Sequence, residues 1–136
     1  NRSSLRAMIV QQRRWLMIGA VLGFLTVLLG AFAAHALKDF LDEVATRRFD
    51  LAVRYAAIHA LAIMIGATVL PLAGRPERLL HAMRNLLIGI VLFSGSLLLL
   101  ALTGLKGFAF FTPLGGLALL VGWGLFALSM RTHNEL

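Results

Sequence analysis

The amino-acid sequence predicts an all-α protein, an integral membrane four-helix bundle, from three observations. Hydrophobic residues make up 60% of the 136 residues, whereas a soluble domain is about half apolar. Four long segments contain no Asp, Glu, Lys or Arg, and each approaches or exceeds the about 20 residues that a helix needs to cross a bilayer. None of them alternates polar and apolar residues as the strands of a membrane barrel do. The segments are residues 15–37, 55–74, 85–105 and 107–130.

The composition also limits the chemistry of the protein. The chain has no cysteine, which excludes disulfides, thiolate metal sites and cysteine nucleophiles. Its formal net charge is +7, and in a membrane protein such basic residues flank the helices and face anionic lipid headgroups. We therefore expect membrane lipids as partners and no binding of nucleic acid.

The first predicted element is a basic interfacial arm over residues 1–14, which holds four arginines around a short apolar patch. Trp15 follows as an interface anchor, and the first helix is expected from about Leu16 to Ala36. This apolar segment is too long for a removed signal peptide and lacks a small-residue cleavage site, so we expect it in the mature protein. Because the sequence begins at Asn1 rather than methionine, we expect further residues before it.

The segment 38–54 is amphipathic and predicts a short surface helix on the outer side, between the first two membrane helices. Asp39 is a candidate N-cap for this surface helix. Thr46 is a candidate N-cap for the second membrane helix, which is expected to continue to about Ala73.

The third membrane helix is expected to begin at Pro76, which suits a first helical turn, and to end near Leu102. Thr112 before a proline predicts the start of the fourth helix, which continues to about Met130. Residues 15–130 are therefore expected to form a single domain of four transmembrane helices, followed by a tail over residues 131–136.

The expected orientation follows from the lysines and arginines near the helix ends, which favour the cytoplasmic side. Eight lie in the N-terminal segment, the 74–85 loop and the tail, and five lie in the 38–54 and 103–109 loops. We therefore expect both termini in the cytoplasm.

Small residues at helical spacing predict the faces on which the helices pack. Lipid provides no hydrophobic drive between helices, so close packing and interhelical hydrogen bonds must hold them together. Each predicted helix carries glycines on one face. The candidate packing glycines are Gly19, Gly23, Gly30, Gly66, Gly89, Gly95, Gly115 and Gly122.

Polar side chains within the apolar segments form two predicted groups. With cytoplasmic termini, one group lies in the outer leaflet, where a neutral imidazole needs hydrogen-bond partners. This expected outer cluster comprises His35, Tyr55, His59, Thr103 and Thr112. The other group lies nearer the middle of the membrane and comprises Thr26, Ser94 and Ser96, and its serines can bond back to helical carbonyls.

Four stretches, one in each predicted helix, carry a resemblance to a known family. They read LGAFAAHAL, YAAIHALA, VLFSGSLLLLAL and FTPLGGLALLVGW. Taken in order, they resemble the motifs of the YgdD/YwdK family of small bacterial inner-membrane proteins, domain of unknown function family 423. The resemblance covers roughly residues 15–130 and implies four helices and a multi-pass location in the inner (cell) membrane, but it brings no settled biochemical activity.

The sequence also departs from the motifs of that family at three positions. Ala33 stands where the family usually has glycine, Ala56 where it commonly has Gln or His, and Leu98 where it has tyrosine. Each change removes a polar or flexible feature, so a site that needs the side chain at position 56 is not expected in this protein.

The preferred functional hypothesis is a non-catalytic accessory or structural subunit that packs in a larger membrane protein complex or a homo-oligomer. Small size and long apolar faces favour it. The first alternative is a small-solute or ion transporter or channel, in which Thr26, Ser94 and Ser96 line a narrow path. This alternative lacks the intramembrane carboxylate that coupled transport usually uses.

Two further alternatives involve the histidines. His35 and His59 are the minimum for bis-imidazole ligation of haem or a metal. No carboxylate is present to support such ligands, so we expect no cofactor. Alternatively, Tyr55, His59 and His35 do acid–base work on a lipid headgroup or a quinone at the outer interface. For an enzyme, Ser94 lies in FSGS, which does not match G-x-S-x-G, and no triad or metal cluster is readable. We therefore expect no catalytic residues.

Overall fold

The computed structural model describes residues 1–132, and every regular element within them is helical. Four stretches of these residues are long and apolar enough to cross a membrane, which confirms the predicted four-helix membrane fold. The helices are α1 (Arg2–Phe32), α2 (Glu43–Thr68), α3 (Pro76–Gly89), α4 (Gly95–Thr103) and α5 (Phe111–Ser129). The π-helical turns η1 (Ala33–Leu37) and η3 (Ile90–Ser94) extend α1 and join α3 to α4, and the 3-10 helices η2 (Leu70–Leu72) and η4 (Lys106–Phe110) lie in connections.

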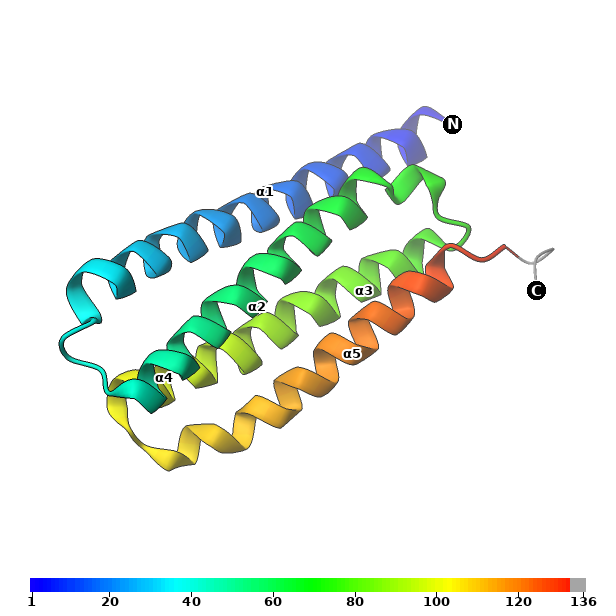
Figure 1. Cartoon of the computed structure of the whole chain (residues 1–136). Coiled ribbons are helices and arrows are strands. Elements are labelled where there is room, and N and C mark those ends of the chain that lie inside the picture. Colours follow the sequence, from blue (N-terminus) through cyan, green and yellow to red (C-terminus); the bar gives the residue numbers. More distant parts are fainter. Residues whose placement is uncertain (133–136) are drawn as a thin grey trace.

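The four spans run antiparallel, and the N-terminus lies at the same end of the bundle as the last described residues (Figure 1). We call this the terminal end, and the opposite end, with the turns after α1 and α4, the loop end. Helix α1 packs mainly on α2, α2 packs on α3 and α4, and α5 packs mainly on α3. The spans therefore follow one another in chain order, with α1 and α5 outermost.

Residues 1–14 do not form a separate arm, because α1 begins at Arg2 and continues through Trp15 without a break. The expected start near Leu16 is therefore wrong. The side chain of Asn1 caps the helix by accepting a hydrogen bond from the Ser4 N–H at 3.0 Å. The Gln12 side chain donates to the Ala67 carbonyl oxygen at 3.0 Å, which fixes this first part of α1 along α2.

The expected surface helix between the first two spans is absent from the described residues. The chain turns over residues 38–42, and residues 43–54 form the first turns of α2 itself. Asp42, rather than Asp39 or Thr46, caps this helix by accepting from the Ala45 N–H at 2.7 Å. Of the apolar residues in this segment, Phe49 and Ala52 are buried inside the bundle, whereas Phe40, Val44 and Leu51 are exposed together with the charged residues.

The ends of the last two spans are partly as expected. Helix α3 begins at Pro76, as predicted, and Gly104 ends α4 in the left-handed conformation with φ of 71°. Thr112 does not cap the last helix, because η4 leads directly into α5 at Phe111 and Thr112 lies inside the helix. Its hydroxyl is used by a side chain of α4 instead. Of the expected tail, residues 133–136 lie outside the described residues.

Five of the eight candidate packing glycines lie where helices approach closely. A Cβ atom at Gly19, Gly66, Gly89 or Gly122 would meet the side chain of Met64, Met83, Leu119 or Leu86, respectively. At Gly115 it would meet backbone, 2.7 Å from Phe93 Cα and 2.8 Å from the Leu92 carbonyl carbon. Gly23 and Gly95 have no such neighbour within 4 Å, and Gly30 has only Val53 at 3.9 Å, so these three are not close-packing positions.

The substitution Gly115→Ala is expected to destabilise the protein by about 1–3 kcal/mol, because backbone of η3 cannot move aside for the methyl group. Unfolding in mixed detergent micelles, followed by circular dichroism against the fraction of SDS, measures the change. Gly95→Ala is the matched control, since its methyl group enters open space. Equal stability of the two variants would contradict the close approach at Gly115.

Candidate functional site

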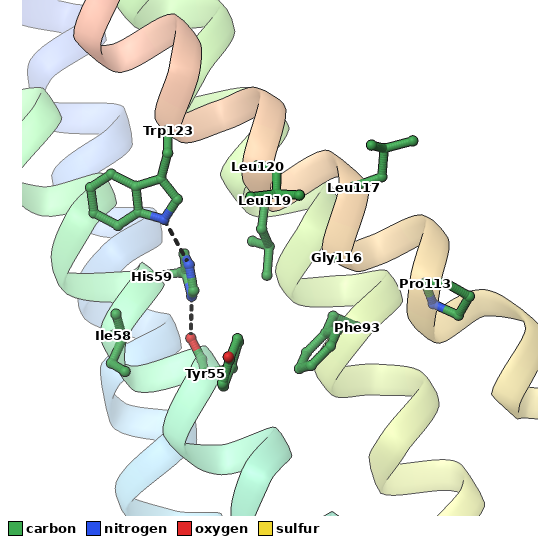
Figure 2. A pocket seen from close by; sticks show the side chains of 10 residues that line it. All are labelled: Tyr55, Ile58, His59, Phe93, Pro113, Gly116, Leu117, Leu119, Leu120 and Trp123. Atoms are coloured by element: carbon green, nitrogen blue, oxygen red, sulfur yellow. Dashed lines mark hydrogen bonds between the residues drawn. The ribbon is translucent and has the colours of Figure 1, made fainter.

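A groove of about 700 Å³ runs between α2 and α5, with η3 at its base. Figure 2 shows Tyr55 and His59 on the α2 side, Phe93 from η3, and Pro113 and Trp123 from α5. Several lining residues are largely exposed at the surface of the protein, with Leu120 at 70% and Trp123 at 44%. Because these helices are long and apolar enough to cross a membrane, we expect the side of the groove to face lipid.

The groove exists because α5 lies against α3 while α2 lies against α4 and η3. Gly116 is the residue of α5 that stands opposite Phe93, and a Cβ there would still be 3.8 Å from the phenyl ring. A glycine at this position therefore leaves the space between α2 and α5 unfilled.

His59 and Trp123 join α2 to α5 across one end of the groove. The Trp123 indole N–H donates to His59 Nε2 at 3.0 Å, and His59 Nδ1 lies 2.6 Å from the Tyr55 carbonyl oxygen (Figure 2). An indole nitrogen only donates and a carbonyl oxygen only accepts. Both bonds are therefore made by one form of the ring, the neutral imidazole with its proton on Nδ1.

Aromatic rings form a continuous wall along the groove. The ring centroids of Phe93 and Tyr55 are 4.7 Å apart, those of Tyr55 and His59 are 5.7 Å apart, and those of His59 and Trp123 are 5.8 Å apart. Tyr55 is 37% exposed, and its hydroxyl makes no hydrogen bond to any residue that the structure describes.

Two serines connect α4 and η3 to the helices on either side. Ser94 donates to the Ala52 carbonyl oxygen of α2 at 2.7 Å, rather than to its own helix as expected. Ser96 donates to the Phe93 carbonyl oxygen at 3.0 Å and lies 2.6 Å from the Thr112 hydroxyl, which must then be the donor of that pair. Thr26, on α1, bonds back to the Gly23 carbonyl oxygen at 2.7 Å. These hydroxyls therefore serve helix packing and do not line a common path.

The five residues of the expected outer cluster do not meet in one place. His35 is exposed in η1, where its neighbours Ala34 and Leu37 line a hollow with residues 46, 49 and 50 of α2. His59 is nine residues further along α2 than Asp50, about 14 Å at 1.5 Å per residue. The two imidazoles are thus held apart, and a bis-histidine site is not assembled within one chain.

The remaining members are also placed separately. The exposed Thr103 bonds to the Leu99 carbonyl oxygen of its own helix at 2.6 Å, and Thr112 pairs with Ser96. Only Tyr55 and His59 are neighbours. His59 lies about 24 Å along α2 from its first residue, Glu43, which places it deep in the bundle rather than at the loop end. Among residues 1–132, no three His, Cys, Asp or Glu residues come together as a metal would require.

Trp123 and Phe93 were not among the expected site residues. Trp123 did carry a signal, because an indole N–H within an apolar helix needs an acceptor and the histidine of YAAIHALA is an intramembrane acceptor. Phe93 carried none, since a phenylalanine in a membrane helix faces lipid or protein equally well.

Comparison with known proteins finds relatives over most of the chain. The family model described as "Protein of unknown function (DUF423)" matches residues 29–116. The UPF0382 inner membrane protein YgdD of Escherichia coli (strain K12) is 40% identical over 113 residues, 83% of this chain and 86% of the relative. The UPF0382 membrane protein of Haemophilus influenzae is 38% identical over 112 residues, 82% and 89% of the two chains. YwdK of Bacillus subtilis is 33% identical over 109 residues, 80% and 89%. No solved structure matches significantly.

The Ser94→Ala variant is expected to lose about 0.6–2 kcal/mol of stability, the range for a hydrogen bond between membrane helices. The SDS unfolding titration again measures the loss. Ser129→Ala is the control, because this equally buried hydroxyl bonds to Phe126 of its own helix and joins no second helix. A loss in Ser129→Ala as large as in Ser94→Ala would contradict a special role for the Ser94 contact.

The hydrogen bonds of His59 predict its protonation state directly. In 15N NMR spectra of labelled protein in micelles, we expect a protonated Nδ1 and an unprotonated Nε2, while the exposed His35 samples both tautomers. In Trp123→Phe, the Nε2 resonance shifts because its donor is lost. A His59 ring protonated on Nε2 would overturn the Trp123 contact.

Proposed function

The chain belongs to the DUF423 family, multi-pass proteins of the bacterial inner membrane, and from this premise we propose that it is a non-catalytic accessory protein that binds an uncharged molecule dissolved in the bilayer. The groove between α2 and α5 is the proposed binding site. The observation that carries the proposal is that a cavity with aromatic walls lies between two helices that are long and apolar enough to cross the membrane, with part of its lining exposed on their outer surface.

The size and position of the groove support a ligand that arrives by lateral diffusion. Its volume of about 700 Å³ lies within the range of about 300–1,000 Å³ that small-molecule sites occupy. Exposed lining residues such as Leu117 and Leu120 leave its side open to a molecule in the membrane.

The charge of the lining supports an uncharged ligand. Among residues 1–132, no Asp, Glu, Lys or Arg lines the groove, and both ring nitrogens of His59 are engaged by protein partners. An ion or a phosphate would therefore lose its hydration without gaining an opposite charge.

The same hydrogen bonds support a non-catalytic role. Acid–base or nucleophilic catalysis needs a group that is free to act on a substrate. Both nitrogens of His59 and the hydroxyls of Ser94 and Ser96 are engaged with the protein itself. The Tyr55 hydroxyl also lines the groove, but among the described residues it has no hydrogen-bonded base that would activate it. This arrangement fits a protein that holds a molecule, or presents it to a larger membrane complex, better than one that converts it.

The proposal predicts that gently purified protein carries an apolar molecule other than bulk phospholipid. Native mass spectrometry of the protein released from nanodiscs, with analysis of its organic extract, detects it. Gly116→Leu fills the groove, so we expect its occupancy to fall by about tenfold or more, the equivalent of ~1.4 kcal/mol.

Gly124→Leu is the matched control. It adds the same side chain to α5 at a position that has open space and does not line the groove, so its occupancy should stay at the wild-type level. The proposal fails if the wild type and Gly116→Leu carry the same molecules in the same amounts.

A further inference from the structure

Resting on the proposed function, we infer that the ligand of the groove is a quinone-class molecule, a flat ring with carbonyl oxygens and a hydrocarbon tail. Its ring lies against the aromatic wall, and one carbonyl oxygen accepts a hydrogen bond from the Tyr55 hydroxyl. The inference concerns binding, and no electron transfer is part of it.

The first argument is the shape and chemistry of the wall. Tyr55 and Phe93 lie side by side with 31° between their ring planes, and Trp123 stands at the other end of the groove (Figure 2). Aromatic rings gain energy from a planar partner beyond the area that they bury. An alkyl chain gains nothing from this and would be held equally well by leucines, so the wall favours a ring.

The second argument concerns the hydrogen-bonding groups of the groove that are not already bonded to the protein. His59 and Trp123 also line the groove, but they satisfy each other and the Tyr55 carbonyl oxygen. Among the described lining side chains, the Tyr55 hydroxyl is the polar hydrogen that remains. A phenol hydroxyl that has no partner in the described residues is free to donate a hydrogen bond to a ligand, so the complementary ligand brings an acceptor.

The third argument is charge complementarity. The described lining residues include no Asp, Glu, Lys or Arg, so a neutral acceptor suits the groove, whereas a phosphate or carboxylate headgroup would find no opposite charge there. A ring carbonyl is a neutral acceptor attached to a planar surface. The tail then continues along the open side, where Leu117 and Leu120 are exposed to lipid.

The experiment uses the full chain in nanodiscs with Trp15→Phe, which leaves Trp123 as the single tryptophan reporter. Decylubiquinone is titrated while the fluorescence of Trp123 is recorded. The same titration of a Trp15→Phe/Gly116→Leu protein gives the quenching that does not depend on the groove. The quenching in excess of this level measures binding in the groove. Decylbenzene, which has ring and tail but no carbonyl, is tested as a competitor. We expect saturable quenching by decylubiquinone and competition by decylbenzene that is weaker by about three- to tenfold, the value of one hydrogen bond.

The variant Tyr55→Phe isolates the hydroxyl, because it keeps the ring against Phe93 and keeps the backbone carbonyl that His59 uses. We expect decylubiquinone to bind about three- to tenfold more weakly and decylbenzene to be unaffected. Thr68→Val, which removes a hydroxyl from the same helix outside the groove, should leave both unchanged.

The outcomes separate this inference from the proposed function. If Tyr55→Phe binds decylubiquinone as tightly as the parent protein, or decylbenzene competes as an equal, the role of Tyr55 and the quinone class are overturned while a groove ligand stands. If the quenching matches that of the Gly116→Leu protein and the organic extract holds no bound molecule, the proposed function falls as well.

Discussion

The structure depends on how closely two helices can approach when lipid provides no hydrophobic force to bring them together. Only direct contact and hydrogen bonds between helices are available, and contact requires small residues. One such close approach lies at Gly115, where α5 packs on the backbone of η3. This contact fixes α5 against the third span. It also sets how far α5 stands from α2, and the groove is the space that remains.

Ser94 and Ser96 explain how the third span contacts α2 on one side and α5 on the other. Residues two apart on a helix point about 200° apart, since each residue turns about 100°. Ser94 therefore reaches α2 while Ser96 reaches α5 from almost the opposite face. With the third span between them, α2 and α5 are connected through side chains, by the His59–Trp123 hydrogen bond and by Phe126 of α5, whose ring approaches Gly66 of α2. The groove thus follows from the same contacts that hold the helices.

Much of the fold could be predicted from the sequence, because the absence of charged residues identifies the segments that cross the membrane. The uncharged segments gave the four spans, and Pro76 gave the start of α3. Predictions from the local sequence, such as a helix cap or a packing glycine, were wrong where contacts with other helices determined the outcome. Thr112 precedes a proline as a capping residue does, yet its hydroxyl is taken by Ser96. Gly23 shares a face with Gly19 by spacing, but nothing approaches it. Such outcomes depend on how the helices pack against one another. The spacing of residues along one helix carries no information about this packing.

In Tyr55, the groups that stabilise the fold differ from the group proposed to bind the ligand. Its carbonyl oxygen orients His59, and its ring packs on Phe93, so both contacts would persist with phenylalanine in its place. The hydroxyl contributes to neither contact. It lines the groove as a hydrogen-bond donor that phenylalanine would lack. Packing therefore accounts for the ring at this position but leaves the hydroxyl unexplained, and a ligand with a neutral acceptor explains it.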